Sequence, residues 1–183
     1  MKIVSTFAVV EESLYSVRYD GEDTHELARL FRLWNDAEYL ESFFTQHQKD
    51  LTRDFWQNMP IEESILKTKN DAKKLQRKLH QIALTGKNSS YETLSTLFKP
   101  LHDNPDYLDP FEKSKTYGMM RPSWLRIYAI RIETNVFVIS GGAIKLTKRM
   151  DRPHLQVELE KLDITQNFCR DNYDLDFDYF EIG

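Results

Sequence analysis

The sequence predicts an α+β fold in which a small antiparallel sheet carries a packed helical region. Two β-rich runs open the chain, long runs with helical spacing of apolar residues follow, and a second pair of β-rich runs comes after residue 123. Helices segregated from antiparallel strands are typical of this class. With 183 residues, of which 40% are hydrophobic and 13% aromatic, the chain can bury the core of one domain over residues 1–183.

The amino-terminal runs predict a β-hairpin. The segments "MKIVSTFAVV" and "LYSVRYD" are rich in β-branched and aromatic residues, and Glu11-Glu12-Ser13 separates them. The first run is too short to span a membrane and is followed by acidic residues. We therefore expect a soluble, cytoplasmic protein that does not insert into a membrane. Its single cysteine, Cys169, fits a reducing compartment.

Residues 24–86 predict an enlarged helical region within the domain. Apolar residues recur at helical spacing to about residue 57, and a slip near Asn35-Asp36 allows one long helix or two shorter ones. Pro60 predicts the first turn of a further helix, and Gly86 predicts its end. Five aromatic residues of this region either all enter the core or leave an exposed patch that marks an interface. They are Trp34, Phe43, Phe44, Phe55 and Trp56.

The second half of the chain predicts a short helix and a hairpin. Residues 89–98 favour the helix, and the proline-rich residues 99–118 favour an irregular connection. Two strands follow, over residues 124–132 and 136–140. Gly141-Gly142 then allow a bulge or a close approach of another backbone.

The chain ends in a predicted helix and a predicted strand. The helix begins near Asp151 and Pro153. The closing strand "YDLDFDYFEI" alternates apolar and acidic residues, and it lacks the glycine of a calcium-binding loop, which excludes an EF-hand. We expect its aspartates to lie near a basic surface and offset its charge. They are Asp174, Asp176 and Asp178.

Charge is segregated along the chain. The net charge is −4, which argues against a protein that coats nucleic acid over its whole surface. Residues 111–150 nevertheless hold eight basic and two acidic residues, whereas residues 151–183 hold nine acidic and three basic ones. The positive charge is therefore local, and it is the first indication of function in the sequence. The eight basic residues are Lys113, Lys115, Arg121, Arg126, Arg131, Lys145, Lys148 and Arg149.

Strand alternation sorts the side chains of residues 124–132 onto two faces. Leu125, Ile127 and Ala129 suit packing against helices. The opposite face presents Trp124, Arg126 and Tyr128, and this order of aromatic, cationic and aromatic side chains can stack bases and bind phosphate. The alternative is that both aromatic residues pack in the core, that the arginine pairs with a carboxylate, and that the later lysines only protect a strand end.

The stretch "WLRIYAIRIETNVFVISGGAIKLTKRM" resembles the core of the RelE/HigB-like toxins of bacterial type II toxin–antitoxin systems, in their phage-derived HigB-like branch. The shared pattern is a strand with an arginine in "(L/Y)-R-(I/L)-x-(Y/F)", a turn, an apolar strand and a lysine-rich segment. "LFKPLHD" is similar to the segment that precedes this strand in the family. The resemblance covers residues 91–168 and implies a RelE-like core.

The resemblance also implies a function. The family cleaves messenger RNA on the ribosome and so inhibits translation, until an antitoxin protein, for which a helix-turn-helix type is one candidate, binds and neutralises the toxin. This endoribonuclease chemistry needs no metal and no cofactor, because the ribose 2′-hydroxyl attacks the adjacent phosphate. Cations stabilise the charge that develops, and a titratable side chain moves the protons.

The resemblance implies a role for each residue of this chain that matches the family pattern. Arg126 matches the strand arginine and would hold the scissile phosphate, while Lys145 and Lys148 match the lysines that stabilise the transition state. The remaining candidates would contact RNA: Trp124, Tyr128, Arg121, Lys113, Lys115 and Arg149. The residue that moves protons stays open among Tyr117, Tyr173, Tyr179 and His154.

Two other interpretations remain. One is a non-catalytic protein-interaction or regulatory module on a RelE-like fold, which would use the helical region to bind its partner. The other is an α+β protein of unrelated function, because a fold does not determine an activity. The five histidines are scattered without the spacing of metal ligands, so we expect no metal site.

Overall fold

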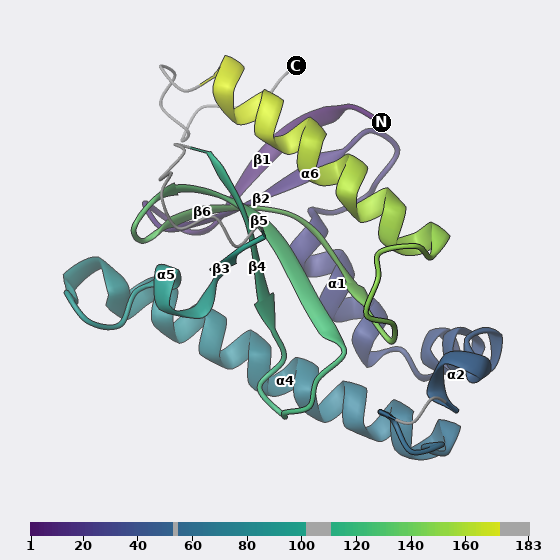
Figure 1. Cartoon of the computed structure of the whole chain (residues 1–183). Coiled ribbons are helices and arrows are strands. Elements are labelled where there is room, and N and C mark those ends of the chain that lie inside the picture. Colours follow the sequence, from purple (N-terminus) through teal and green to yellow (C-terminus); the bar gives the residue numbers. More distant parts are fainter. Residues whose placement is uncertain (53–54, 102–110, 173–183) are drawn as a thin grey trace.

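The computed structural model describes residues 1–52, 55–101 and 111–172. Among these residues, six strands form one sheet in the order β1-β2-β6-β5-β4-β3, with helices on both of its faces (Figure 1). The predicted α+β class is confirmed. The sheet is mixed rather than purely antiparallel, because β2 and β6 run parallel. The closing strand predicted at residues 173–182 lies outside the described residues.

The predicted amino-terminal hairpin is confirmed as β1 (Ile3–Val10) and β2 (Leu14–Tyr19). Its turn places Glu12 in the left-handed region, with φ of 59°. The second hairpin joins β5 (Leu125–Glu133) to β6 (Val136–Ile144), which continues beyond the predicted residue 140.

The strand β4 (Glu112–Tyr117) was not predicted, because residues 99–118 favoured an irregular connection. The side chains that β4 buries are Ser114 and Thr116, which are small and polar. Alternation of apolar and polar residues, the usual sign of a strand, is therefore absent from "EKSKTY". The short β3 (Lys99–Pro100) pairs with β4 at the edge of the sheet.

The helical region follows the predicted spacing closely. It holds α1 (Glu26–Asn35), α2 (Ala37–Gln46), α3 (Gln48–Leu51) and α4 (Ile61–Thr85). Of the two alternatives left open near Asn35-Asp36, the structure has separate helices, because the Asp36 carboxylate accepts hydrogen bonds from the first backbone N–H groups of α2. The remaining helical elements are the 3-10 turn Gly86–Asn88, α5 (Leu94–Leu97) and α6 (Pro153–Asp171).

The helices enclose the sheet from both sides. The larger core lies between one face and α1, α2 and α4, and it receives Leu125, Ile127 and Ala129 as predicted. The second core lies between the other face and α6, and it receives Tyr128 and Ile130. The middle of β5 is therefore buried on both faces, which explains the apolar run from Ile127 to Ile130.

Asn135 closes one end of the sheet. Its side chain accepts a hydrogen bond from the Leu94 backbone N–H and donates one to the Ser13 hydroxyl. A Cβ on Gly86 would lie 2.3 Å from the Asn135 Oδ1 atom, so glycine allows the end of α4 to reach this turn. The turn between β5 and β6 is thus joined to the amino-terminal hairpin, α4 and α5.

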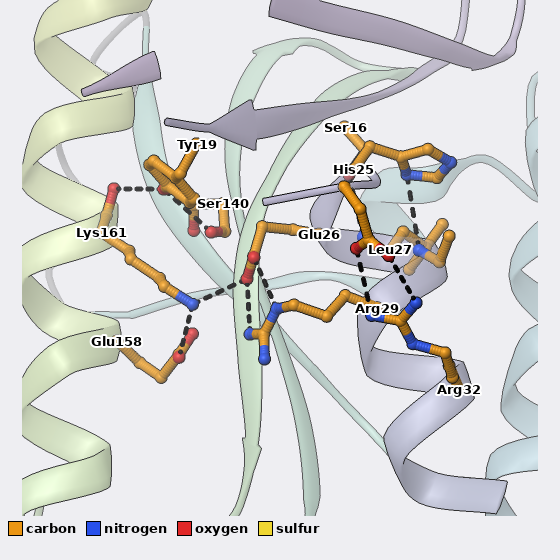
Figure 2. Close-up of polar contacts among 12 residues, drawn as sticks. Ser16, Tyr19, His25, Glu26, Leu27, Arg29, Arg32, Ser140, Glu158 and Lys161 are labelled. Atoms are coloured by element: carbon orange, nitrogen blue, oxygen red, sulfur yellow. Dashed lines mark hydrogen bonds and ion pairs between the residues drawn. The ribbon is translucent and has the colours of Figure 1, made fainter. Parts of the chain in front are cut away.

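A buried ion cluster joins α1 to α6 across the sheet (Figure 2). The strands β2 and β6 pair only over three residues each, up to Ser16 and Ile139, although both strands continue. Beyond that point the Tyr19 hydroxyl donates to the Ser140 carbonyl over 3.0 Å. The Glu26 carboxylate lies 2.7 Å from the ammonium group of Lys161. The polar cluster thus fills the space where β2 no longer pairs with β6.

The two carboxylates of the cluster are held differently. Burial opposes the ionisation of Glu26, but the hydrogen bond from Arg29 and the charge of Lys161 keep its pKa below the ordinary value. Burial raises the pKa of Glu158 to about 7 against the opposing charge of Lys161. One oxygen of Glu158 has no hydrogen-bond partner among the described residues. A Cβ on Gly141 would lie 2.0 Å from that oxygen, which is a side-chain atom. The predicted close approach of another backbone occurs at Gly142, where a Cβ would lie 2.6 Å from the Arg126 carbonyl oxygen.

Replacement of Glu158 by glutamine should change how stability depends on pH. The raised pKa means that the folded protein keeps a proton that the unfolded chain releases above about pH 4.5, so Glu158 lowers stability as pH rises from there towards 7. Relative to wild type, Glu158→Gln should therefore gain up to roughly 3 kcal/mol between pH 5 and pH 8. Urea denaturation at both pH values measures this difference.

The matched control for this prediction is Glu160→Gln, at an exposed position of the same helix. Its difference from wild type should be the same at both pH values. A constant difference for Glu158→Gln as well would show that Glu158 does not bind the extra proton.

Candidate functional site

A groove of about 1090 Å³ opens at the end of the sheet where β5 begins and β6 ends. It is bounded by a turn after α3, the segment between β4 and β5, and the segment between β6 and α6. The lining residues are Phe55, Trp56, Tyr117, Arg121, Pro122, Ser123, Arg126, Lys145, Leu146, Thr147, Lys148, Arg149 and Asp151.

The lining of the groove is strongly cationic. It contains five basic side chains and one carboxylate, that of Asp151, which lies 3.6 Å from Arg152. Within the described part of the chain, none of the five forms an ion pair, whereas Lys113 pairs with Asp163 and Arg152 pairs with Asp50. Among the described residues, carboxylates therefore neutralise Lys113 and Arg152 but not the cations of the groove. The five are Arg121, Arg126, Lys145, Lys148 and Arg149.

Arg126 is half-buried near the start of β5. Its guanidinium donates to the carbonyl oxygens of Ser123 and Leu125, over 2.8 and 2.7 Å. Burial lowers its pKa from the ordinary value, and the nearby Arg121 acts in the same direction. An arginine stays protonated even so, and its hydrogen-bond partners among the described residues are neutral carbonyl groups.

Lys145 follows β6 directly and points its ammonium group back at the chain. It donates to the carbonyl oxygens of Thr147 and Lys148, over 2.7 and 2.6 Å. Burial lowers its pKa first, and the charges of Arg126 and Lys115 lower it further. Lys145 is therefore close enough to Arg126 and to Lys115 to be repelled by both, and a bound anion would relieve that repulsion.

Tyr117 lies against two of the cations. The Cζ atom of Arg126 is 4.0 Å from the centre of its ring, and that of Arg121 is 5.0 Å away. Tyr117 and Arg126 are partners in the register of β4 and β5, so the sheet itself sets this contact. Among the candidates for moving protons, Tyr117 is brought into the groove, while Tyr173 and Tyr179 lie outside the described residues.

His154, the remaining candidate, is not a lining residue. Its Nε2 atom is 3.0 Å from the Ile144 carbonyl oxygen, and its ring contacts those of His47 and Phe43. Burial lowers its pKa from the ordinary value. The side chain thus packs beneath the segment that leads into α6.

The two aromatic residues predicted to stack on bases are core residues instead. Trp124 and Tyr128 are each 1% exposed. The indole of Trp124 donates to the Thr68 hydroxyl and packs on Trp56, while Tyr128 faces the second core beneath α6. A sheet with helices on both faces leaves neither ring a free side on which a base could lie.

The other predicted RNA-contacting residues divide into two groups. Arg121 and Arg149 line the groove, and Lys115 lies near enough to affect Lys145. Lys113 occurs earlier in β4 and is occupied by its ion pair with Asp163 on α6. The parity of β4 places both lysines on one sheet face, but α6 covers only part of that face.

A buried carboxylate positions one wall of the groove. Asp71 of α4 accepts hydrogen bonds from the Met120 backbone N–H, over 2.8 Å, and from the Ser123 hydroxyl. A Cβ on Gly118 would lie 2.0 Å from the Asp71 Oδ2 atom. The long helix thus holds the segment that carries Arg121. The sequence did not identify Asp71, because it lies within the charged stretch "KTKNDAKKLQRK" that is typical of a solvated helix surface.

Three further observations concern metal ligands, membrane-spanning helices and the single cysteine. Within residues 1–52, 55–101 and 111–172, no three His, Cys, Asp or Glu side chains are grouped to hold a metal ion. In the same part of the chain, no helix is long and apolar enough to cross a membrane. Cys169 is fully buried, and burial raises its pKa to about 12, which disfavours a thiolate nucleophile.

Replacement of Asp71 by alanine should destabilise the protein. The change leaves a partly buried backbone N–H and a buried hydroxyl without this acceptor, which lowers the free energy of unfolding by roughly 2–4 kcal/mol. Urea denaturation measures this loss. Asp163→Ala, which breaks an exposed ion pair, is the control and should cost about 1 kcal/mol or less. Equal effects of the two changes would contradict a positioning role for Asp71.

Comparison with known proteins identifies no relative of this chain. No protein-family model matches it, and neither the curated proteins nor the solved structures contain a significant match. The resemblance to RelE/HigB-like toxins therefore stays a prediction, and the α+β class is what the structure establishes.

Proposed function

We propose that the cationic groove binds the phosphodiester backbone of RNA, and that the protein is a toxin-type endoribonuclease. In this proposal it cuts messenger RNA on the ribosome in the cytoplasm, so that translation stops until an antitoxin protein covers the groove. The observation that carries the proposal is that five basic side chains gather in one groove of an acidic protein and form no ion pair with any residue that the structure describes.

Phosphate is the anion that suits this lining. A phosphodiester offers unprotonated oxygens to several donors at once, and it would relieve the repulsion of Lys145 by Arg126 and Lys115. The guanidinium groups of Arg121 and Arg126 also flank the ring of Tyr117. The negative charge of the remaining surface would keep RNA from binding elsewhere.

Strand cleavage needs no group beyond those in the groove. The 2′-oxygen forms a bond to phosphorus and loses its proton to a base, the bond to the 5′-oxygen breaks, and that oxygen takes up a proton. The products are a 2′,3′-cyclic phosphate and a 5′-hydroxyl. Arg126, Lys145 and Lys148 supply charge to the phosphorane-like transition state, and Tyr117 is the proposed proton carrier.

Expression of the protein in a bacterium that lacks a cognate antitoxin should block growth and the incorporation of labelled amino acids. Arg126→Ala, and separately Lys145→Ala with Lys148→Ala, should abolish the block because each removes charge from the groove. Arg131→Ala, which lies at the far end of β5, is the matched control and should stay toxic. Circular dichroism checks that every variant folds.

The outcome separates catalysis from binding alone. A block that the groove variants lose would lead next to mapping of messenger RNA ends. Folded wild-type protein without any effect would refute the toxin proposal and favour the non-catalytic interaction module, in which the groove receives an acidic segment of a partner protein.

The salt dependence of RNA binding offers a test that does not require activity. Each cation that neutralises a phosphate of a single strand contributes about −0.7 to the slope of log K against log salt concentration. Replacement of the exposed Arg149 by alanine should reduce that slope by about one such step and weaken binding at low salt. An unchanged slope would show that Arg149 contacts no phosphate.

A further inference from the structure

The rim of the groove carries an exposed aromatic ring. The side chain of Phe55 is 62% exposed, whereas that of Trp56 is 5% exposed. Within the described lining of the groove, Phe55 is the large apolar residue that remains accessible. Of the five aromatic residues that the sequence left open between core and interface, the other four lie in the core, and Phe55 is the exposed one. The four are Trp34, Phe43, Phe44 and Trp56.

The ring of Phe55 packs against a buried neighbour. It meets the ring of Trp56 edge to face, with centroids 4.6 Å apart. The indole N–H of Trp56 donates to the Leu146 carbonyl over 2.8 Å, and its ring packs on Trp124. Phe55 is therefore held against the segment that carries the lysines of the groove.

The turn after this pair has an unusual backbone. Gln57 and Asn58 both adopt the left-handed region, with φ of 51° and 56°. Residues other than glycine adopt it at a cost in free energy, and two in succession are rare. The Met59 N–H closes the turn on the Trp56 carbonyl over 3.2 Å. This conformation leads the chain from the buried Trp56 to α4 and leaves Phe55 at the rim.

We propose that Phe55 is a stacking platform for an unpaired nucleobase, which makes single-stranded RNA the ligand of the groove. The inference rests on the proposed function and narrows it. A duplex keeps its bases stacked inside, and an inorganic polyphosphate has none, so neither would use an aromatic ring beside cations. A single strand uses both, because its phosphates meet the basic side chains while a base lies on the ring.

The test compares a ligand that has nucleobases with one that has none. One is a uridine strand of about six nucleotides, with 2′-O-methyl groups that prevent cleavage, and the other is an inorganic polyphosphate of the same charge. Titration calorimetry with the wild type and Phe55→Ala measures both affinities. Phe55→Ala should bind the strand roughly tenfold more weakly and bind the polyphosphate as wild type does. Phe55→Tyr, which keeps a ring, should retain the affinity for the strand.

Control variants separate failure of the inference from failure of the proposed function. Phe7→Ala removes another exposed ring, on β1, and should change neither affinity. Lys148→Ala should lower the affinity for both ligands. Suppose that Phe55→Ala leaves the affinity for the strand unchanged while Lys148→Ala lowers the affinity for both ligands. The stacking platform is then refuted, and phosphate binding by the groove stands. If wild type binds neither ligand, both proposals are refuted.

Discussion

The buried ion pair between Glu26 and Lys161 is the constraint on which the arrangement of layers depends. It joins α1 on one face of the sheet to α6 on the other, at the place where β2 and β6 cease to pair. Two charges with almost no exposure are costly to bury, and removal of one partner would leave the other uncompensated. The cluster therefore contributes little net stability but strongly disfavours any other placement of α6.

The placement of α6 in turn determines the groove. The segment that carries Lys145, Lys148 and Arg149 runs between β6 and the start of α6, so its path depends on where that helix begins. A second ion pair holds the same junction, because Arg152 binds the nearly buried Asp50 through two hydrogen bonds of 2.9 and 2.7 Å. The cations of the groove are thus positioned by carboxylates that lie elsewhere.

Much of the fold could be predicted from the sequence, because the signals were local. The hairpins, the break at Asp36 and the helix from Pro60 to Gly86 all follow from spacing, capping residues and turn residues. The strand β4 was missed because it buries Ser114 and Thr116, and the parallel pairing of β2 with β6 has no local signal at all.

The sequence predicted which basic residues form the candidate site, but not the residues that enclose them. The basic segment indicated Arg121, Arg126, Lys145, Lys148 and Arg149, all of which line one groove. Alternation alone suggested free aromatic rings beside Arg126, whereas α6 and the helical region cover both faces of β5. The partners that complete the groove lie 49 to 90 positions away along the chain, which no spacing within the basic segment can reveal.

The parallel pairing of β2 with β6 also bears on when the protein can fold during its synthesis. The first hairpin can close early, but its neighbour in the sheet is made last among the strands of the described residues, and the pair of Glu26 with Lys161 spans 135 positions. Contacts so distant along the chain form slowly and late. The groove therefore takes shape only after most of the polypeptide has left the ribosome, so a nascent chain carries its basic segment without an assembled site.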